Sequence, residues 1–223
     1  PCALWGMGHS LEDCATFPGM RDKSSEGGKA DIAFAKQLMA DAGYPDGFTV
    51  KYDARQVGNY PDVCSVVKQQ LSDTLGIEGN IATHESAAGY ALFGTSRAGT
   101  GDWELACQGE GMTVLDPDAL LGGVYLKGGT RNYTDWEPEI ARTAFEAQKV
   151  EQDPAKRQQL LKDYEDFLVP TNPDDISQGF DDNHWVTLYW GQFFWLTHED
   201  IRGFNAPATV QYSFKHEDLW LDR

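Results

Sequence analysis

The sequence predicts an α/β fold in which helices pack against a mixed sheet. Helical and strand patterns alternate along the first half of the chain, as they do in a sheet layer covered by helices. A short run at 103–107 then leads through Gly109 and Gly111 into a helix that begins at Asp116-Pro117. α/β proteins often place a ligand at such a junction, although an ordinary strand-to-helix connection has the same pattern.

Six elements form the alternating part. In each expected helix, apolar residues recur on one face, and Gly43 and Gly76 end the first two helices. The expected helices cover 29–42, 61–75 and 86–96. The expected strands, all assigned to one sheet, are Phe48–Ala54, Ile77–Thr83 and Trp103–Cys107.

Beyond Asp116 the chain is expected to be mainly helical, at 116–125, at 137–150 and from Asp153-Pro154 to about 168. The predicted inward residues of the last two helices are Ile140, Ala144 and Ala147, then Leu160, Tyr164, Phe167 and Leu168. The most apolar run, Val186–Leu196, is predicted to be a strand with alternate residues in the core. Residues 1–28 are expected to be irregular.

The composition limits the partners. The chain has 223 residues, of which 18 are basic and 35 acidic, so its formal net charge is −17. Nucleic acids and anionic membranes are disfavoured as partners, because both require a basic surface. No apolar run is long enough to span a bilayer, so membrane insertion is not expected. A strongly acidic surface is otherwise typical of a soluble protein, and it is compatible with a cationic ligand or a saline habitat.

The four cysteines have no metal-finger spacing. Cys2 and Cys14 lie in a loop-like segment and are expected to form a disulfide if the protein is exported. Cys64 falls in a helical pattern and Cys107 in a strand, and we interpret both as small core residues.

No motif indicates a catalytic centre, a metal site or a cofactor. The five histidines are scattered, and there is neither a nucleophile elbow nor a phosphate-binding loop. Pairs of carboxylates such as Glu110 with Asp116 could serve a glycosidase, but 35 acidic residues produce such pairs by chance. The seven Trp, nine Tyr and eleven Phe are more informative, since aromatic faces line sites for organic solutes as well as cores.

Several segments resemble, in order, the motifs of the family 5 extracellular solute-binding proteins, the peptide/nickel-type receptors of ABC importers. Residues 35–48, AKQLMADAGYPDGF, are similar to the "AkkLLaeAGYpdGf" signature of that family. Later matches are YPDV at 60–63, GDWEL at 101–105, DPD at 116–118, RNY at 131–133, DPAKR at 153–157 and LWLD at 219–222. Each motif is soft alone, but the ordered set with its spacing is specific.

The resemblance implies the C-terminal lobe of a type II periplasmic binding protein-like fold, with a solute-binding and non-catalytic role. It divides the chain into an irregular segment (1–28), a solute-binding lobe (29–196) and a tail (197–223) that in the family returns to an N-terminal lobe. That lobe and the signal peptide are expected outside this chain. The implied partners are a small organic solute of the peptide or opine class and the permease subunits of an ABC importer. The implied location is periplasmic or extracellular.

The resemblance also indicates a binding loop. In peptide-binding members, the loop after the "GdfDl" strand carries a Trp and, three residues later, an Asp that pairs with the α-ammonium group of the peptide. Those positions fall on Glu110 and Thr113, so neither family residue is present. We expect solute contacts from Gln108, Glu110, Met112, Thr113 and Asn132, and a solute that differs from an ordinary peptide.

Two other functions stay open from the sequence. An acid–base hydrolase would use Glu110 and a second carboxylate at glycosidase spacing. A protein-interaction domain would expose a large apolar patch that another chain covers.

Overall fold

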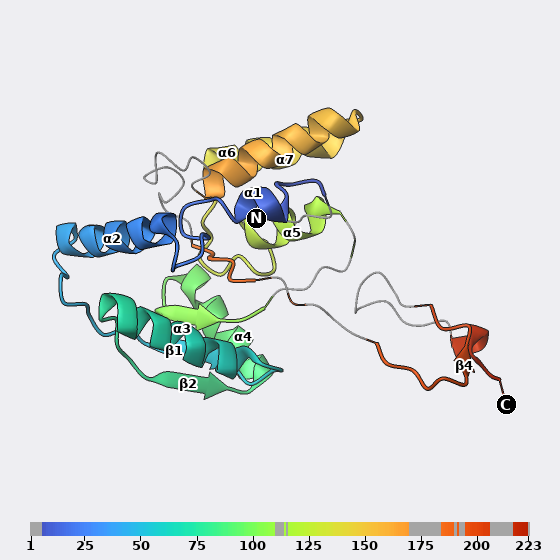
Figure 1. Ribbon diagram of the computed structural model, residues 1–223, viewed down its shortest axis with the longest axis horizontal. Helices are drawn as coiled ribbons and strands as arrows, with labels where there is room; N and C mark the ends of the chain where they lie inside the picture. Colours follow the sequence, from blue (N-terminus) through green and yellow to red (C-terminus); the bar gives the residue numbers. More distant parts are fainter. Residues whose placement is uncertain are drawn as a thin grey trace.

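The computed structural model describes residues 6–109, 114, 116–169, 184–189, 191, 195–205 and 216–222. In this part of the chain a small sheet with α3 and α4 lies below a group of helices that includes α6 and α7 (Figure 1). The helices are α1 (Leu11–Cys14), α2 (Glu26–Asp41), α3 (Tyr60–Leu75), α4 (Ser86–Gly94), α5 (Pro117–Val124), α6 (Glu139–Val150) and α7 (Pro154–Leu168), with short 3-10 helices η1 (Thr95–Ala98) and η2 (His216–Asp218). The strands are β1 (Tyr52–Arg55), β2 (Ile81–His84), β3 (Leu105–Cys107), β4 (Ile201–Arg202) and β5 (Trp220–Leu221).

The three predicted strands form one sheet, as expected from the alternating pattern. The order is β2-β1-β3, and both pairings are parallel, with Tyr52 opposite Ile81 and Leu105. Each strand is shorter than predicted and begins later. Between 48 and 51, for example, Thr49 makes only an isolated bridge with Glu78. The antiparallel pair β4–β5 is a separate sheet.

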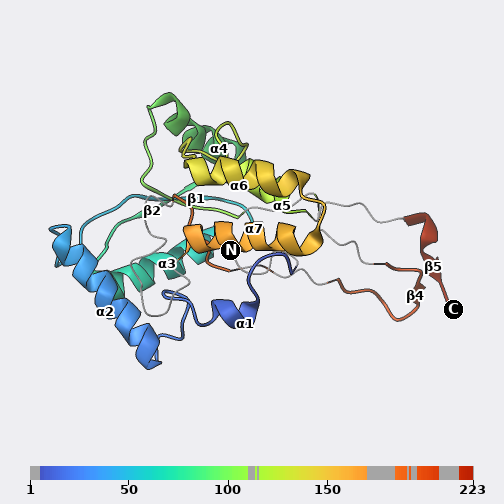
Figure 2. The same cartoon turned by 90° about the horizontal axis from the view of Figure 1, so that it is seen from above.

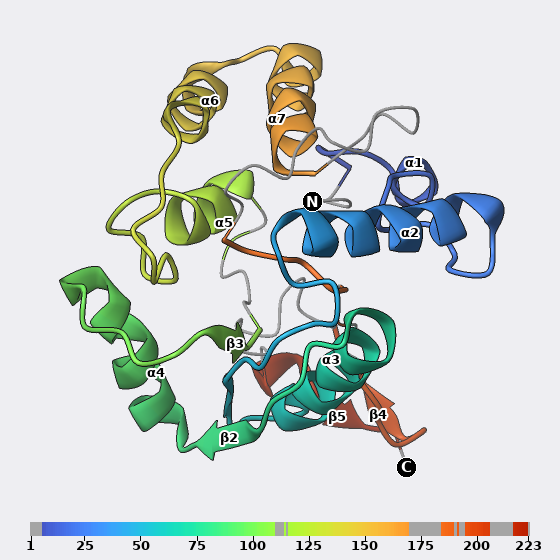
Figure 3. The ribbon, with the colours of Figure 1, turned by 90° about the vertical axis from the view of Figure 1, so that its left-hand side faces the viewer.

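The central strand β1 is buried on both faces. Successive side chains of a strand point to opposite sides, and α3 and α4 lie on opposite sides of the sheet (Figure 3). Tyr52 and Ala54 pack in the apolar cluster under α3, which includes Cys64 and Cys107. Asp53 and Arg55 alternate with them and are also buried.

Two glycines bring the end of the signature segment, 35–48, against the end of α3. Gly76 ends α3 in the left-handed conformation, at φ +68°, and its N–H donates to the last-turn carbonyls. Gly47, at φ +88°, packs against it so closely that a Cβ there would overlap the Gly76 carbonyl oxygen. The turn before β1 and the end of α3 therefore meet backbone to backbone.

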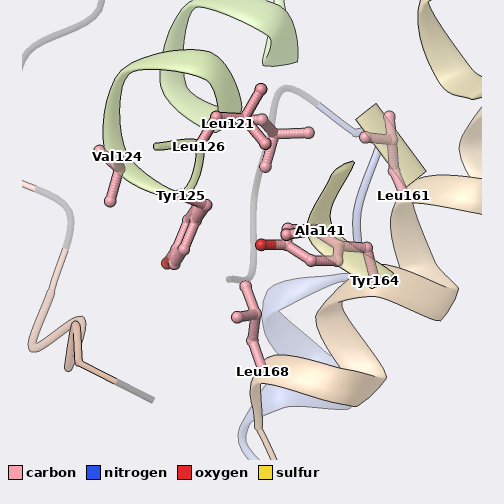
Figure 4. Close-up of a cluster of buried hydrophobic side chains, with 8 residues drawn as sticks. All are labelled: Leu121, Val124, Tyr125, Leu126, Ala141, Leu161, Tyr164 and Leu168. Atoms are coloured by element: carbon pink, nitrogen blue, oxygen red, sulfur yellow. The ribbon is translucent and has the colours of Figure 1, made fainter. Parts of the chain in front are cut away.

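A second core lies between α5, α6 and α7. Figure 4 shows Tyr125 and Tyr164 among the aliphatic side chains, and their rings pack edge to face with centroids 5.7 Å apart. The α6 and α7 helices lie side by side in Figure 2. The buried members of this core are Leu121, Val124, Tyr125, Leu126, Ala141, Leu161, Tyr164 and Leu168.

Tyr164 and Leu168 are buried as predicted, but one predicted inward residue of each helix, α6 and α7, is replaced by the residue that follows it. Ala141 is buried, whereas Ile140 is 39% exposed. On α7, Leu161 is fully buried and Leu160 only half-buried. The apolar pattern failed on α6 because a polar side chain, Gln148, occupies an inward position, where its amide donates to the Asp118 carboxylate and the Phe145 carbonyl.

Two other predictions were wrong. The segment 1–28 is not irregular throughout, because Ser10 and Asp13 form a capping box that starts α1. The run Val186–Leu196 is not a strand in its described residues, which have no regular secondary structure and include Leu196 at 97% exposure. A strand needs a neighbour for its ladder, and no described strand pairs with this run. The β4–β5 pair beyond it lies apart from the rest of the described fold (Figures 1 and 2).

The three described cysteines are oxidised. Cys64 and Cys107 form a disulfide, so their interpretation as simple core residues is corrected, although both are buried. Cys14 is also disulfide-bonded. Its predicted partner, Cys2, lies outside the described residues, so that pairing stays a prediction. No described helix is long and apolar enough to cross a membrane.

The difference between Leu160 and Leu161 can be measured. We expect Leu161→Ala to lower the free energy of unfolding by about 2 to 5 kcal/mol, because it leaves a cavity in the second core. Leu160→Ala should cost about 1 kcal/mol, since that side chain is only half-buried. Urea unfolding followed by circular dichroism compares the two, and equal losses would contradict the observed face of α7.

Candidate functional site

The carboxyl ends of the three parallel strands meet at one edge of the sheet. Arg55, His84 and Cys107 are the last residues of β1, β2 and β3. The chain then enters α3 after β1 and α4 after β2. In open α/β sheets, ligands bind in the crevice outside the carboxyl ends of the strands. We call this region, formed by Arg55, Tyr60, Tyr90, Gln108 and Gly109, the carboxyl edge.

Arg55 is the centre of the carboxyl edge. Only 4% of the residue is exposed, and its Cζ lies 3.5 Å from the ring centroid of Tyr90 and 5.6 Å from that of Tyr60. Its Nη2 donates to Ser86 Oγ at 3.0 Å. Its Nε and Nη1 are buried and have no acceptor among the described residues. Arginine stays charged in proteins, so these donors favour an anion.

An acceptor lies beside these donors. Cys107 pairs with Ala54, so Gln108 follows on the strand next to Arg55 and on the same face of the sheet. Gln108 Oε1 is buried and has no donor among the described residues. Tyr60 Oη donates to the carbonyl oxygen of Gly109 at 3.3 Å and holds the backbone there. The carboxyl edge thus offers both donors and an acceptor for a ligand.

The surrounding charges are partly balanced. Arg131 lies over the same tyrosine as Arg55, with its Cζ 4.4 Å from the ring centroid of Tyr90. The buried carboxylate of Asp53 lies on the same face of β1, and its Oδ1 is 2.7 Å from His84 Nε2.

The structure locates two of the five predicted solute contacts. Gln108 is at the carboxyl edge, as described above. Asn132 is fully buried, and its Nδ2 donates to the Trp136 carbonyl at 2.7 Å within its own loop. Its contact with a solute stays a prediction. Glu110, Met112 and Thr113 lie outside the described residues, so their roles stay predictions as well.

The arginines and tyrosines of this site were not among the predicted solute contacts. A charged residue at the end of an otherwise buried strand, as in YDAR at 52–55, is the signal that could have pointed to Arg55. Arg131 belongs to the RNY motif at 131–133, which suggested no role for it, and no local pattern marks Tyr90, which reaches Arg55 from α4.

A salt bridge fixes the helix that follows the predicted binding loop. Asp116 caps α5 by accepting from the N–H of Asp118 at 3.0 Å. Arg157 on α7 binds the same carboxylate with both terminal nitrogens, at 3.0 and 2.7 Å, and also bonds to Gln148. The hydrogen bonds from Arg157 lower the pKa of Asp116 below its usual value of 3.8. The DPD and DPAKR motifs are therefore the two halves of one contact.

Among the described residues, no three His, Cys, Asp or Glu side chains are grouped so that they could hold a metal ion.

No family model and no curated protein matches the chain. Solved structures do resemble it. HbpA2 from Haemophilus parasuis is 24% identical, with a TM-score of 0.53 over 65% of this chain and 28% of that one. DppA from Helicobacter pylori, solved with the peptide STSA, is 23% identical, with a TM-score of 0.52 over 60% of this chain and 26% of DppA.

The murein tripeptide-binding protein MppA from Escherichia coli gives a TM-score of 0.56 at 14% identity, over 73% of this chain and 31% of MppA. The chain has the fold of part of a periplasmic binding protein. It spans less than a third of the length of each of these three structures. Identities this low establish the periplasmic binding protein fold, and ligand and role require separate arguments.

The contact between α5 and α7 gives a pH-dependent prediction. We expect Asp116→Asn to lower the free energy of unfolding by about 1 kcal/mol at pH 7, a modest value because the pair is partly exposed to solvent. The folded-state pKa of Asp116 is depressed, so its contribution is present above the unfolded pKa and is lost as pH falls through the folded value. The deficit should therefore shrink below about pH 4.

Urea unfolding between pH 2.5 and pH 7 measures this deficit. Glu26→Gln is the matched control, because Glu26 pairs with Lys29 on the fully solvated surface of α2. It should change stability little at any pH. A deficit for Asp116→Asn that stays constant across this range would contradict the role of the carboxylate charge.

Proposed function

We propose that this chain is the C-terminal lobe of a family 5 substrate-binding component of an ABC importer. In this proposal it binds an anionic, peptide-like solute at the carboxyl edge and delivers it to permease subunits from the periplasm or cell surface. The fold of part of a periplasmic binding protein supports the class. The observation that carries the proposal is the buried guanidinium of Arg55, which has two donors without an acceptor among the described residues.

The energetics favour an anionic ligand. A buried polar group without a hydrogen-bond partner costs about 1 to 3 kcal/mol, and a charged group costs more. A carboxylate can accept from Nε or from Nη1 of Arg55, whose N–H groups point to opposite sides of the guanidinium group. Gln108 Oε1 would accept an N–H from the same solute. A C-terminal carboxylate with an adjacent amide supplies both groups.

The solute differs from an ordinary peptide in how its other end is held. Thr113 stands where peptide-binding members carry the Asp that pairs with the α-ammonium group, according to the family resemblance. We therefore propose that recognition depends on the anionic end, and that solutes with a blocked or missing ammonium group also bind. The hydrolase alternative depends on Glu110, outside the described residues, and no observation here favours it over binding.

A pair of matched probes tests this proposal. N-acetyl-trialanine with a free carboxylate should shift the amide resonances of Gly89 and Gly109 in NMR titrations, and the same peptide with a C-terminal amide should not. Arg55→Gln should weaken binding of the acid by about tenfold or more, which corresponds to about 1.4 kcal/mol. Arg55→Lys should retain part of the affinity, because it keeps the charge but loses the planar set of guanidinium donors.

The control for this experiment is Arg142→Gln. Arg142 is an arginine as well, but it pairs with the carboxylate of Glu137 on the surface of α6, away from the carboxyl edge. It should leave probe binding unchanged. Equal binding of the acid and the amide, or an unchanged affinity in a folded Arg55→Gln variant, would refute the proposed site.

The affinity of this chain alone is a further prediction of the two-lobe proposal. A receptor that encloses its ligand buries most of the ligand surface, typically more than about 70%. With one lobe, the solute keeps a face in water but still loses translational and rotational freedom, at a cost of about 4 kcal/mol or more. We expect dissociation constants well above about 1 μM by calorimetry for the physiological solute. A tighter value, beyond about −8 kcal/mol, would mean that the site is complete in this chain.

A further inference from the structure

The Cys64–Cys107 disulfide joins the two elements that carry the carboxyl edge. Cys64 lies in α3 and Cys107 is the last residue of β3, with a Cα–Cα distance of 5.5 Å and a sequence separation of 43. Residues four apart on a helix share a face, so Tyr60 lies one turn before Cys64 on the same side of α3. Gln108 directly follows Cys107. Each cysteine is thus close to a residue of the proposed binding site.

The disulfide supports a weak part of the sheet. In the described sheet β3 is an edge strand of three residues that pairs only with β1. The start of β3 is held by side chains, since Glu104 accepts from the Lys51 N–H at 2.6 Å and Trp103 donates to the Phe93 carbonyl at 3.2 Å.

The end of β3 has fewer contacts of this kind. Beyond the ladder, the described links from Cys107 to Gly109 into α3 are the disulfide and the 3.3 Å hydrogen bond from Tyr60 to Gly109. The ends of short edge strands open at low free energy when few contacts hold them. The covalent link therefore determines where Gln108 and Gly109 lie relative to Arg55.

We propose that the Cys64–Cys107 disulfide is a redox-sensitive positioning element of the carboxyl edge. Both cysteines are buried, so the thiolate of a dithiol reductant attacks one sulfur when the end of β3 opens, and a mixed disulfide forms. The second thiol of the reductant then displaces the protein, leaving two cysteine thiols and a cyclic oxidised reductant. Two electrons pass from the reductant to the protein disulfide. The sheet and α3 stay folded, while Gln108 and Gly109 move away from Arg55 and the site loses its acceptor.

The consequence for binding rests on the proposed function, whereas the release of the strand end does not. Hydrogen exchange measures that release without any ligand. We expect treatment of the folded protein with dithiothreitol to raise the exchange rates of the 107–109 amides by tenfold or more. The amides of Tyr52 and Ala54 should keep their protection, because both side chains are fully buried in the central strand.

A variant assigns the effect to this disulfide. Cys64→Ala/Cys107→Ala, never exposed to reductant, should show the same fast exchange at 107–109 and bind N-acetyl-trialanine at least tenfold more weakly than the parent. Cys2→Ala/Cys14→Ala is the control and should resemble the oxidised parent at 107–109. If the first variant fails to fold, exchange in the reduced native protein decides the question, because no refolding is needed.

The outcomes are distinct. Unchanged exchange at 107–109 after complete reduction, or simultaneous loss of protection throughout the sheet, would overturn the positioning role. If the oxidised parent does not bind the probe while exchange at 107–109 rises on reduction, the proposed function fails and the positioning of the strand end stands. Equal probe affinity in a variant with fast exchange would overturn the coupling between the disulfide and the site.

Discussion

The burial of β1 on both faces is the constraint on which the rest of the structure depends. Strands enclosed on both sides of a parallel sheet are usually apolar throughout, yet this strand alternates Tyr52 and Ala54 with Asp53 and Arg55. The apolar pair requires α3, with its disulfide, on one side. The charged pair requires α4 on the other, and α4 approaches closely only because Gly89 has no Cβ, which would lie 2.5 Å from Arg55 Cγ. That approach brings the Tyr90 ring onto the guanidinium.

Features that depend on neighbouring residues were predictable from the sequence. Asp116 and Asp153 each precede a proline and cap a helix through their own side chains, and both helices begin there in the structure. Gly76 ends α3 in the predicted way, because only a residue that tolerates positive φ fits. The three strands were also found in one sheet, since helix–strand alternation leaves few other arrangements.

Features that depend on distant residues were not predictable. The cysteines of the buried disulfide are 43 residues apart, and their approach is a consequence of the pairing of β1 with β3. The run Val186–Leu196 has the composition of a strand, but composition does not supply the neighbour that a strand needs. The residues of the candidate site differ in the same way. Gln108 was predicted from the loop motif, whereas Arg55 became a candidate only when its burial beneath α4 was known.

The charge of the chain means that the proposed recognition of an anion at the carboxyl edge would be a short-range effect. At a net charge of −17 the protein repels an anionic solute at a distance, and physiological salt screens that repulsion beyond about 8 Å. In the proposal, attraction begins only close to the guanidinium group of Arg55. A guanidinium kept out of water and stacked on Tyr90 also has little rotamer freedom left to lose when it binds. Affinity and selectivity in this proposal therefore depend on the fixed geometry of the edge, which the disulfide is proposed to maintain.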